Sequence, residues 1–254
     1  MSYGVKEIMG LLSKSSELSN SLELDQLILF TRLASRLRRE ILHLQKPSWL
    51  EDIAPPGDQL PMHVRRFFAL SMGWTHSKVT VCWDSDALRD FIWTAGKNLE
   101  ANEIACPHPE DMALFEQHGH PLSLAYHNIY PPNTRCISND CKENDSPKLL
   151  RRKDGPRRIT VYGINGAYPG FSIHLLCHHC STNYHNNFSV KSDFRTYYGG
   201  IPRLIQVGEH QLFEKKALDL FISMMLISWT SATNSARIFD HCLSKYDTLK
   251  RETK

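Results

Sequence analysis

The segment from residue 136 to residue 180 decides the fold that the sequence predicts. It opens with CISNDC (residues 136–141) and closes with CHHC (residues 177–180), and the two cysteine pairs flank a basic insert. A tight turn with two to four residues between its cysteines supplies two ligands to a tetrahedral zinc ion, at about 2.3 Å from each sulfur. The spacing therefore predicts a structural Zn²⁺ site formed by Cys136, Cys141, Cys177 and Cys180.

The alternative interpretation of these cysteines is four reduced thiols, partly buried as small hydrophobic groups, whose spacing is accidental. The first pair is looser than a typical zinc knuckle, and the insert between the pairs is longer than that of a usual zinc ribbon. The chain holds seven cysteines, an odd number, and Lys6, Glu7 and Lys14 interrupt the apolar stretch that a secretory signal would need. We therefore expect a nuclear or cytoplasmic protein, not a secreted one, whose thiols meet metal more readily than one another.

Composition adds few constraints. With 254 residues, 41% of them hydrophobic and 22% charged, the chain is long enough to bury a sizeable core. A formal net charge of +3 is small, so any attraction to nucleic acid must come from local clusters of charge. The most apolar segment, residues 217–229, contains Asp219 and is shorter than the roughly 20 residues that cross a bilayer. It predicts a central buried helix, and no membrane association is expected.

Hydrophobic spacing predicts helices in the first part of the chain, at Leu22–Leu44, Met62–Met72 and Asp84–Ala95. A short strand is predicted at Lys78–Trp83, which is rich in β-branched residues.

Beyond residue 100 the pattern changes to short strands, and two further helices are predicted after Gly208. The predicted fold class is α+β, in three regions: a helical amino-terminal region (1–100), a zinc-stapled antiparallel β-sheet with a basic hairpin (101–208), and two carboxy-terminal helices packed on the same core (209–254).

The basic hairpin is predicted from Asp154-Gly155, a dipeptide that favours a tight turn, between flanking strands over residues 148–153 and 157–162. A two-stranded ribbon of this kind can lie in a groove of duplex DNA or along its phosphates. The candidate nucleic-acid-binding residues are Lys148, Arg151, Arg152, Lys153, Arg157 and Arg158. The alternative is a solvated surface turn without a ligand.

A second group of side chains that can bind metal comprises Cys106, His108, His118 and His120. No paired-knuckle spacing occurs among them, so the sequence leaves open whether they form a second metal site or are surface residues of polar, proline-bounded loops.

The order of several motifs resembles a known family: CPHPE (106–110), RCISNDC (135–141), FSIHLLCHHC (171–180), TNYHNNFSV (182–190), YYGGIPRLIQVGEHQLFEKKALDLF (197–221) and SWTSATNSARIF (228–239). Over residues 101–242 the chain resembles the cysteine-cluster domains, of the fifth CxC class, that are associated with fungal KDZ (Kyakuja-Dileera-Zisupton) transposases. The resemblance implies a zinc-chelating module with DNA, a transposase or another protein as partner. It implies no catalysis, because the transposase relies on a separate RNase H-like domain, so we expect no enzyme activity.

Two other classes of function remain open at this stage. A small metal-dependent nuclease would use a histidine base beside a cysteine knuckle, and His178, His179 and His185 are the candidates. The strand-like residues 188–190 argue against it, because such a site needs a helix there. The other class is a protein-interaction scaffold with purely structural zinc, whose binding would depend less on salt than DNA binding does. Whether the chain is a stand-alone protein or a transposon relic, and its oligomeric state, stay open.

Overall fold

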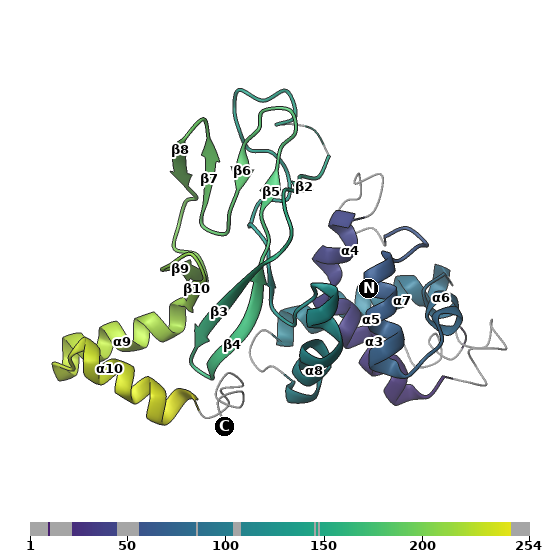
Figure 1. The fold of residues 1–254 in the computed structure, drawn as a ribbon, viewed down its shortest axis with the longest axis horizontal. Coiled ribbons are helices and arrows are strands. Elements are labelled where there is room, and N and C mark those ends of the chain that lie inside the picture. Colours follow the sequence, from purple (N-terminus) through teal and green to yellow (C-terminus); the bar gives the residue numbers. More distant parts are fainter. Residues whose placement is uncertain are drawn as a thin grey trace. The chain divides into compact units, whose positions relative to one another are not determined.

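The computed structural model describes residues 10, 22–44, 56–84, 86–103, 108–144, 146 and 148–244 (Figure 1). The chain divides into two compact units. The helical unit comprises Met1–Asn128 and Ser146–Leu149, and the cysteine unit comprises Ile129–Asp145 and Leu150–Lys254. Helices and two sheets together confirm the α+β class. The boundary between residues 100 and 101 suggested by the sequence falls inside one helix, Asp86–Glu103.

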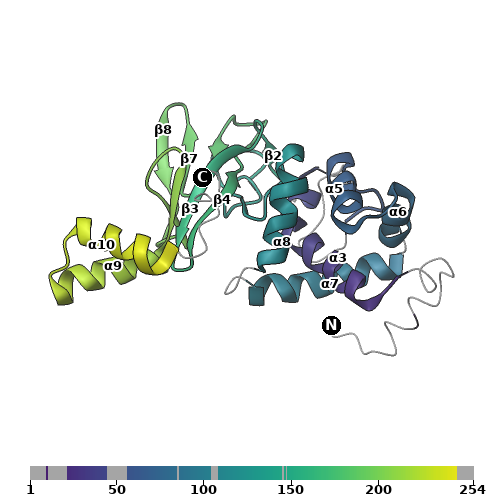
Figure 2. The ribbon, with the colours of Figure 1, turned by 60° about the horizontal axis from the view of Figure 1, so that its bottom comes forward.

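The helical unit is a cluster of short helices around one apolar core (Figure 2). Its elements are α3 (Leu24–Arg36), α4 (Arg38–Leu44), α5 (Met62–Met72), α6 (His76–Asp84), α7 (Asp86–Glu103), α8 (Pro109–Leu114), η1 (Phe115–Gly119) and η2 (His120–Leu122).

The amphipathic pattern over residues 22–44 is confirmed, with one break. Leu27, Phe30 and Leu33 of α3 are buried, and so are Leu37 and Ile41. Leu37 itself leaves helical geometry (φ −93°, ψ 5°), which separates α3 from α4. The apolar face continues across the break, so both helices bury the same side.

The strand predicted at Lys78–Trp83 is wrong, because these residues lie in α6. The buried side chains of α6 are Val79, Cys82 and Trp83, at positions i, i+3 and i+4. This is the period of a helix, and it gives the segment one face to bury against α5 and α7. Packing of that face overrides the strand preference of the β-branched residues.

The cysteine unit contains two five-stranded sheets. Sheet A has the order β1-β4-β3-β10-β9, and sheet B has the order β2-β5-β6-β7-β8. The strands of sheet A are β1 (Asn128–Ile129), β4 (Gly166–Ser172), β3 (Arg157–Gly163), β10 (Gln211–Glu214) and β9 (Leu204–Gln206). The strands of sheet B are β2 (Arg151–Arg152), β5 (Leu175–Leu176), β6 (Asn183–Tyr184), β7 (Phe188–Lys191) and β8 (Phe194–Tyr197).

The expectation of an antiparallel sheet holds for sheet B and needs correction for sheet A. All strand pairs of sheet B are antiparallel. In sheet A, β10 runs parallel to β3 and antiparallel to β9, so this sheet is mixed. The parallel pair arises because the chain passes through all of sheet B before it returns to sheet A.

The basic hairpin predicted over residues 148–162 is not formed. β2 pairs with β5 of sheet B, whereas β3 pairs with β4 of sheet A, so the two flanks of Asp154-Gly155 belong to different sheets. The backbone N–H of Lys153 donates to the carbonyl of His174, which extends the contact of β2 with β5. The tight turns lie elsewhere, at Ile164-Asn165 between β3 and β4, where β4 then begins with Gly166 (φ 117°), and at Ser192 and Asp193 (φ 47° and 68°) between β7 and β8.

Two helices follow β10, namely α9 (Lys215–Ser228) and α10 (Ala232–Ile238), and α10 continues into a short π-helical turn, η3 (Phe239–Leu243). They lie side by side in both ribbon views (Figures 1 and 2). The prediction of a central buried helix is wrong, because Ala217 is the buried residue of α9 and its other apolar side chains are half-buried or exposed. Within the described part of the chain, no helix has the length and apolar character to cross a membrane.

Candidate metal centre

Two loops of the cysteine unit hold the four predicted cysteines. The first loop is a turn in which the backbone N–H of Cys141 donates to the carbonyl of Ser138, at 2.9 Å. The second loop joins β5 to β6, and the backbone N–H of Cys177 donates to the carbonyl of Thr182, at 3.0 Å. Ser181 closes this loop in the left-handed conformation (φ 56°). Each loop thus presents two sulfurs on one side.

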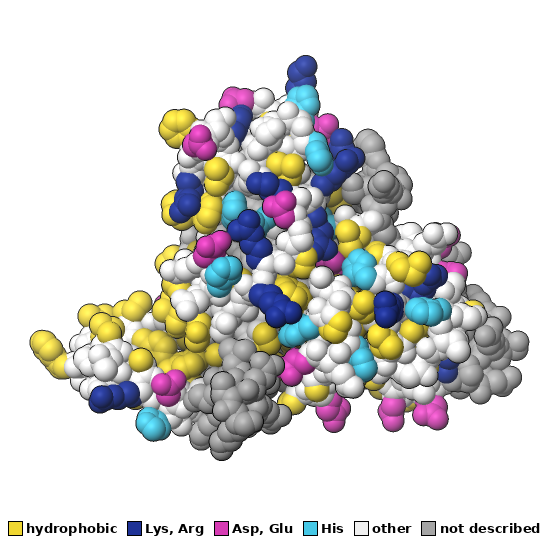
Figure 3. Space-filling view, in the orientation of Figure 1, with side chains coloured by type: hydrophobic (Ala, Val, Ile, Leu, Met, Phe, Trp, Pro, Cys, Tyr) yellow, Lys and Arg dark blue, Asp and Glu magenta, His cyan; other side chains and the backbone are white. Residues whose placement is uncertain are grey.

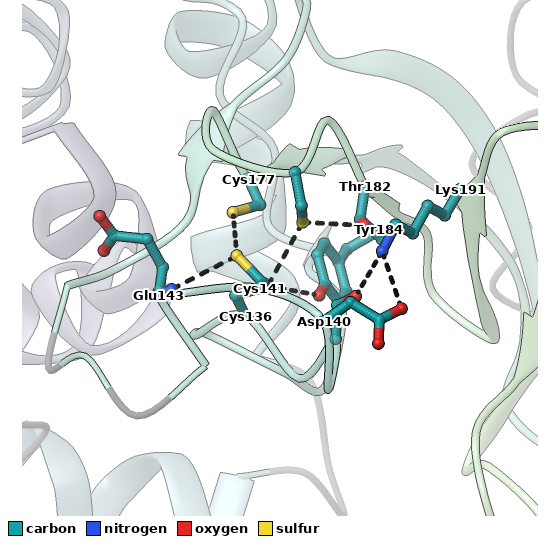
Figure 4. Close-up of polar contacts among 10 residues, drawn as sticks. Cys136, Asp140, Cys141, Glu143, Cys177, Thr182, Tyr184 and Lys191 are labelled. Carbon is teal, nitrogen blue, oxygen red and sulfur yellow. Dashed lines mark hydrogen bonds and ion pairs between the residues drawn. The ribbon is translucent and has the colours of Figure 1, made fainter.

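The four Sγ atoms converge to within 4.8 Å of one another (Figure 4). The distance is 3.7 Å between the sulfurs of Cys136 and Cys180, and 3.8 Å between those of Cys141 and Cys177. Sulfurs at about 2.3 Å from a central ion in tetrahedral geometry lie roughly 3.8 Å apart, so both close pairs match the edge of such a tetrahedron. The donor set therefore fits a metal ion held by four thiolates.

Hydrogen-bond donors surround the sulfurs. The backbone N–H of Glu143 donates to Sγ of Cys141 at 3.4 Å, and those of His179 and Cys180 donate to Sγ of Cys177. The hydroxyl of Thr182 lies 3.1 Å from Sγ of Cys180. Such contacts orient metal ligands and stabilise the negative charge that thiolates carry.

Burial and these hydrogen bonds act in opposite directions on the acidity of the thiols. Burial raises the pKa of Cys141 to about 12 and also raises the pKa of Cys177. Burial acts in the same direction on Cys180, but hydrogen bonds from the side chain and backbone of Thr182 and from neighbouring thiols outweigh it and lower the pKa to about 6. At neutral pH one sulfur of the cluster is thus ready as a thiolate, and thiols that coordinate a divalent cation lose their protons outright.

Tyr184 of β6 forms hydrogen bonds with the first cysteine loop, a role that the sequence did not predict. Its side chain is fully buried, its hydroxyl donates to Sγ of Cys136 at 3.2 Å, and the same hydroxyl accepts the backbone N–H of Ile137 at 3.0 Å. Burial, followed by the hydrogen bond to Cys136, raises the pKa of Tyr184, so it stays a donor. A strand tyrosine carries no local signal of this role, because the contact joins residues far apart in the sequence.

A second contact ties the first cysteine loop to sheet B. The ammonium group of Lys191, at the end of β7, lies 3.1 Å from the hydroxyl of Ser138 and 3.4 Å from a carboxylate oxygen of Asp140 (Figure 4). Asp140 is largely exposed, so this ion pair contributes little stability by itself. It restricts the loop from the side opposite to Glu143.

The second group of metal-capable side chains, which the sequence left open as a site, forms no metal-binding cluster among the residues described. The four-cysteine group is the single cluster of three or more metal-binding side chains in this part of the chain. His108 is exposed and its backbone N–H donates to the hydroxyl of Tyr126, while His118 and His120 lie half-buried in η1 and η2. Cys106 lies outside the described residues.

The structure places the six basic residues proposed for nucleic acid on several different elements. Lys148 belongs to the helical unit. Arg151 and Arg152 occupy opposite faces of sheet B because side chains alternate along β2. Lys153 follows β2, whereas Arg157 and Arg158 begin β3 of sheet A, and Arg157 lies 3.6 Å from a carboxylate oxygen of Glu209.

One face of sheet B nevertheless gathers cations and aromatic rings, and we call it the cationic face: Arg151, Lys153, His174, His185, Phe188, Arg195 and Tyr197. The imidazole rings of His174 and His185 lie 4.1 Å apart, and His185 stacks on Phe188 at 4.6 Å. The guanidinium carbon of Arg195 lies over the ring of Phe188, 4.2 Å from its centroid. Tyr197 pairs with Phe188 across β7 and β8.

This face points away from the cysteines. Tyr184 and Lys191 reach the cysteine loops from one side of the sheet, and alternation along β7 places Phe188 on the other side. Tyr197 is the register partner of Phe188, and Arg195 is the partner of Val190, so both lie on the same side of the sheet as Phe188. Both residues are exposed. Burial, and after it the charges of His174, Arg157, Lys153 and Arg195, lower the pKa of His185 to about 4.

Residues 124–243 match a protein family described as a CxC5 like cysteine cluster associated with KDZ transposases. All four cysteines fall inside the match, which begins at Leu124 and not at Ala101 as the motifs had suggested. This part of the chain is therefore similar to the CxC5 family, and the match takes in the described cysteine unit up to Leu243. The search of curated proteins gave no match, and neither did the search of solved structures.

Proposed function

We propose that residues 124–243 form a zinc-binding, non-catalytic module that contacts DNA through the cationic face of sheet B. The observation that carries the metal assignment is the convergence of four cysteine sulfurs. Four thiolates in tetrahedral arrangement favour Zn²⁺, with iron as the competing metal for the same ligands. All four protein ligands are present, so the centre is closed and its metal would have no open position for a substrate, as in structural zinc sites.

The size of sheet B supports a structural role for the metal. Its strands are two to four residues long, and β8 is exposed along its whole length. Such a sheet buries too little apolar surface to be stable by itself, and metal binding at the junction of its two cysteine loops would supply the missing folding free energy.

Metal content measured on purified protein tests the first half of the proposal. We expect one equivalent of zinc per chain by mass spectrometry under native conditions and by elemental analysis. One equivalent of iron, with the visible absorption of an iron–thiolate centre, would identify the bound metal as iron instead of zinc. A fully folded, metal-free protein would refute the assignment.

The cationic face supports the second half of the proposal. Arg151, Lys153 and Arg195 supply positive charge for phosphates, and the exposed ring of Tyr197 offers a surface on which a base can stack. Contacts of this kind are tolerant of sequence, because phosphates carry no base identity. Single-stranded and duplex DNA should both bind, and stacking on Tyr197 should favour the single strand.

A titration at two salt concentrations, with matched variants, tests the DNA contact. Lys153→Ala/Arg195→Ala removes a lysine and an arginine from the cationic face, whereas Lys216→Ala/Arg66→Ala removes the same residue types from exposed positions outside sheet B. The first variant should lower the slope of log affinity against log salt by up to about two, and the control should leave it nearly unchanged. Equal effects of both variants, or no binding at low salt, would refute the DNA contact and leave the metal assignment intact.

The absence of catalysis is part of the proposal and has its own test. Divalent-metal-dependent cleavage of DNA by the purified protein, lost in His179→Ala or His185→Ala, would establish a nuclease instead. The protein-interaction scaffold is favoured by a different observation, the exposed apolar side chains of α9.

A further inference from the structure

α9 buries only one narrow side. Ala217 is fully buried, and one turn further along the helix the ring of Phe221 meets that of Phe239 in η3 at 6.3 Å. Phe239 in turn meets Tyr162 of β3 at 5.8 Å. This row anchors the helix to α10 and to sheet A, and it uses one side of a helix that is apolar on several.

The remaining sides of α9 expose large apolar side chains. Leu226, Ile227 and Trp229 are 76%, 79% and 92% exposed, and the exposed set is Leu220, Ile222, Met225, Leu226, Ile227 and Trp229. Hydrophobic side chains gather over α9 in the space-filling view (Figure 3). Weighted by their exposed fractions, these six side chains offer on the order of 800 Å² of apolar surface, which is what one partner contributes to an interface of standard size.

Trp229 gives an independent indication of binding. It ends α9 in the left-handed conformation (φ 52°, ψ 29°), where glycine is the usual residue and a side chain with a Cβ atom costs free energy. The indole is also the most exposed large apolar group of the described chain. The folded chain itself gains little from a bulky residue that strains the backbone and is almost wholly exposed, so Trp229 is suited to a contact outside its own chain.

We propose that α9 and α10 pair with the same helices of a second copy of this chain, so that the protein is a homodimer joined by a four-helix bundle. The charge pattern favours a second copy over another protein, because residues 220–236 hold no charged side chain. An unlike partner is usually selected by complementary charges, which this surface lacks, and no like charges oppose self-association. A two-helix hairpin whose α9 is apolar and uncovered outside the row of Ala217 and Phe221 can pair with its own copy about a two-fold axis.

Sedimentation or light scattering on the full chain, with three variants, tests the dimer. Leu226→Glu/Ile227→Glu places charge at the centre of the surface and should weaken dimerisation more than about a hundredfold. Trp229→Gly should weaken it at least about tenfold and, at concentrations where the chain is monomeric, leave the thermal midpoint unchanged or raise it. Leu70→Glu changes an exposed leucine of α5 (47% exposed) and should leave the dimer intact.

Several results would overturn the proposal. One is a parent protein that stays monomeric at about 100 µM, since interfaces of this area give micromolar or tighter binding. Another is a dimer that resists both α9 variants while circular dichroism shows their fold unchanged. A monomeric parent that floats with phosphatidylcholine vesicles would assign the surface to lipid, and a monomeric parent that captures only a different protein would assign it to that partner.

Discussion

The helical unit and the cysteine unit reach a stable fold by different means. The helical unit buries a continuous cluster of aliphatic and aromatic side chains, among them Phe30, Phe67 and Phe115, in which ring centroids approach to 4.5 Å. Sheet B of the cysteine unit has strands too short for such a core, and beside it the sulfurs of four cysteines converge. The family match lies on the second unit. The comparison teaches that packing stabilises the helical unit, whereas the cysteine unit carries four converging cysteines inside the segment that matches the family.

The largest effect is expected when one cysteine of the cluster is replaced or the metal is removed. In Cys177→Ser, or after removal of metal by a chelator, we expect sheet B to lose its structure, because structural zinc sites contribute on the order of 10 kcal/mol to folding. The helices of the helical unit should keep their protection in hydrogen-exchange mass spectrometry. Cys242→Ser is the matched control, since Cys242 is exposed and lies outside the cluster. Loss of protection throughout the chain would contradict independent stability of the two units.

The converse test removes packing from the helical unit. Phe67 is fully buried and its ring lies 4.5 Å from that of Phe115, so Phe67→Ala should destabilise this unit by about 3–5 kcal/mol. Metal stoichiometry should not change. Leu70→Ala, three residues further along α5 and exposed, should cost much less. Denaturant unfolding followed by elemental analysis of the folded fraction gives both quantities. A loss of metal in Phe67→Ala alone would show that the units depend on each other.

These two regions also differ in how far the sequence predicts them. The helical period of Leu27, Phe30 and Leu33 is local, so the sequence predicts α3 and its buried face. The cysteine spacing identifies two short loops that each carry two thiols, and that part of the signal is local. The meeting of the two loops is a long-range contact, because Cys136 lies beside Cys180 and Cys141 beside Cys177, and it was predicted from the chemistry of a four-thiolate metal site.

Long-range partners explain the errors. Asp154-Gly155 favours a local hairpin, but β2 finds its partner in β5 and β3 finds its partner in β4, and no local signal encodes these pairings. The apolar composition of α9 predicts burial, yet the chain supplies cover for only one side of that helix. A uniformly apolar sequence therefore predicts that a helix is buried against other elements. It does not predict whether those elements belong to the same chain or to another one.

A smaller effect is expected from the hydroxyl that supports the centre. Tyr184→Phe removes a donor to Cys136 and the acceptor for the N–H of Ile137 while it keeps the ring. Loss of such a supporting contact typically lowers metal affinity by about 10–100-fold. Tyr197→Phe, an exposed tyrosine of the same sheet, should leave affinity unchanged. Competition with a chromophoric chelator measures both. Equal affinities for the two variants would mean that the hydroxyl does not orient Cys136.

The smallest expected effect concerns pH and the cationic face. Burial, together with the nearby charges of His174, Arg157, Lys153 and Arg195, lowers the pKa of His185 to about 4 from an ordinary value of 6.5. Above pH 6.5 the imidazole is neutral in both folded and unfolded chains, so it adds no pH dependence. Between pH 6.5 and 4 the unfolded chain takes up a proton that the folded chain does not. The free energy of unfolding therefore decreases as the pH is lowered through this window.

His185→Gln should therefore flatten the loss of stability of the cysteine unit between pH 6.5 and 4, measured by denaturant unfolding at constant free zinc. Protonation of the four cysteines also lowers stability in acid, but it does so in parent and variant alike, and the difference between the two curves isolates His185. The helical unit should show no difference between parent and variant. Parallel curves for the cysteine unit would mean that burial and the nearby charges do not lower the pKa of this imidazole in the folded protein. A polyanion bound to the cationic face should raise the pKa of His185, because added negative charge offsets the cations around it.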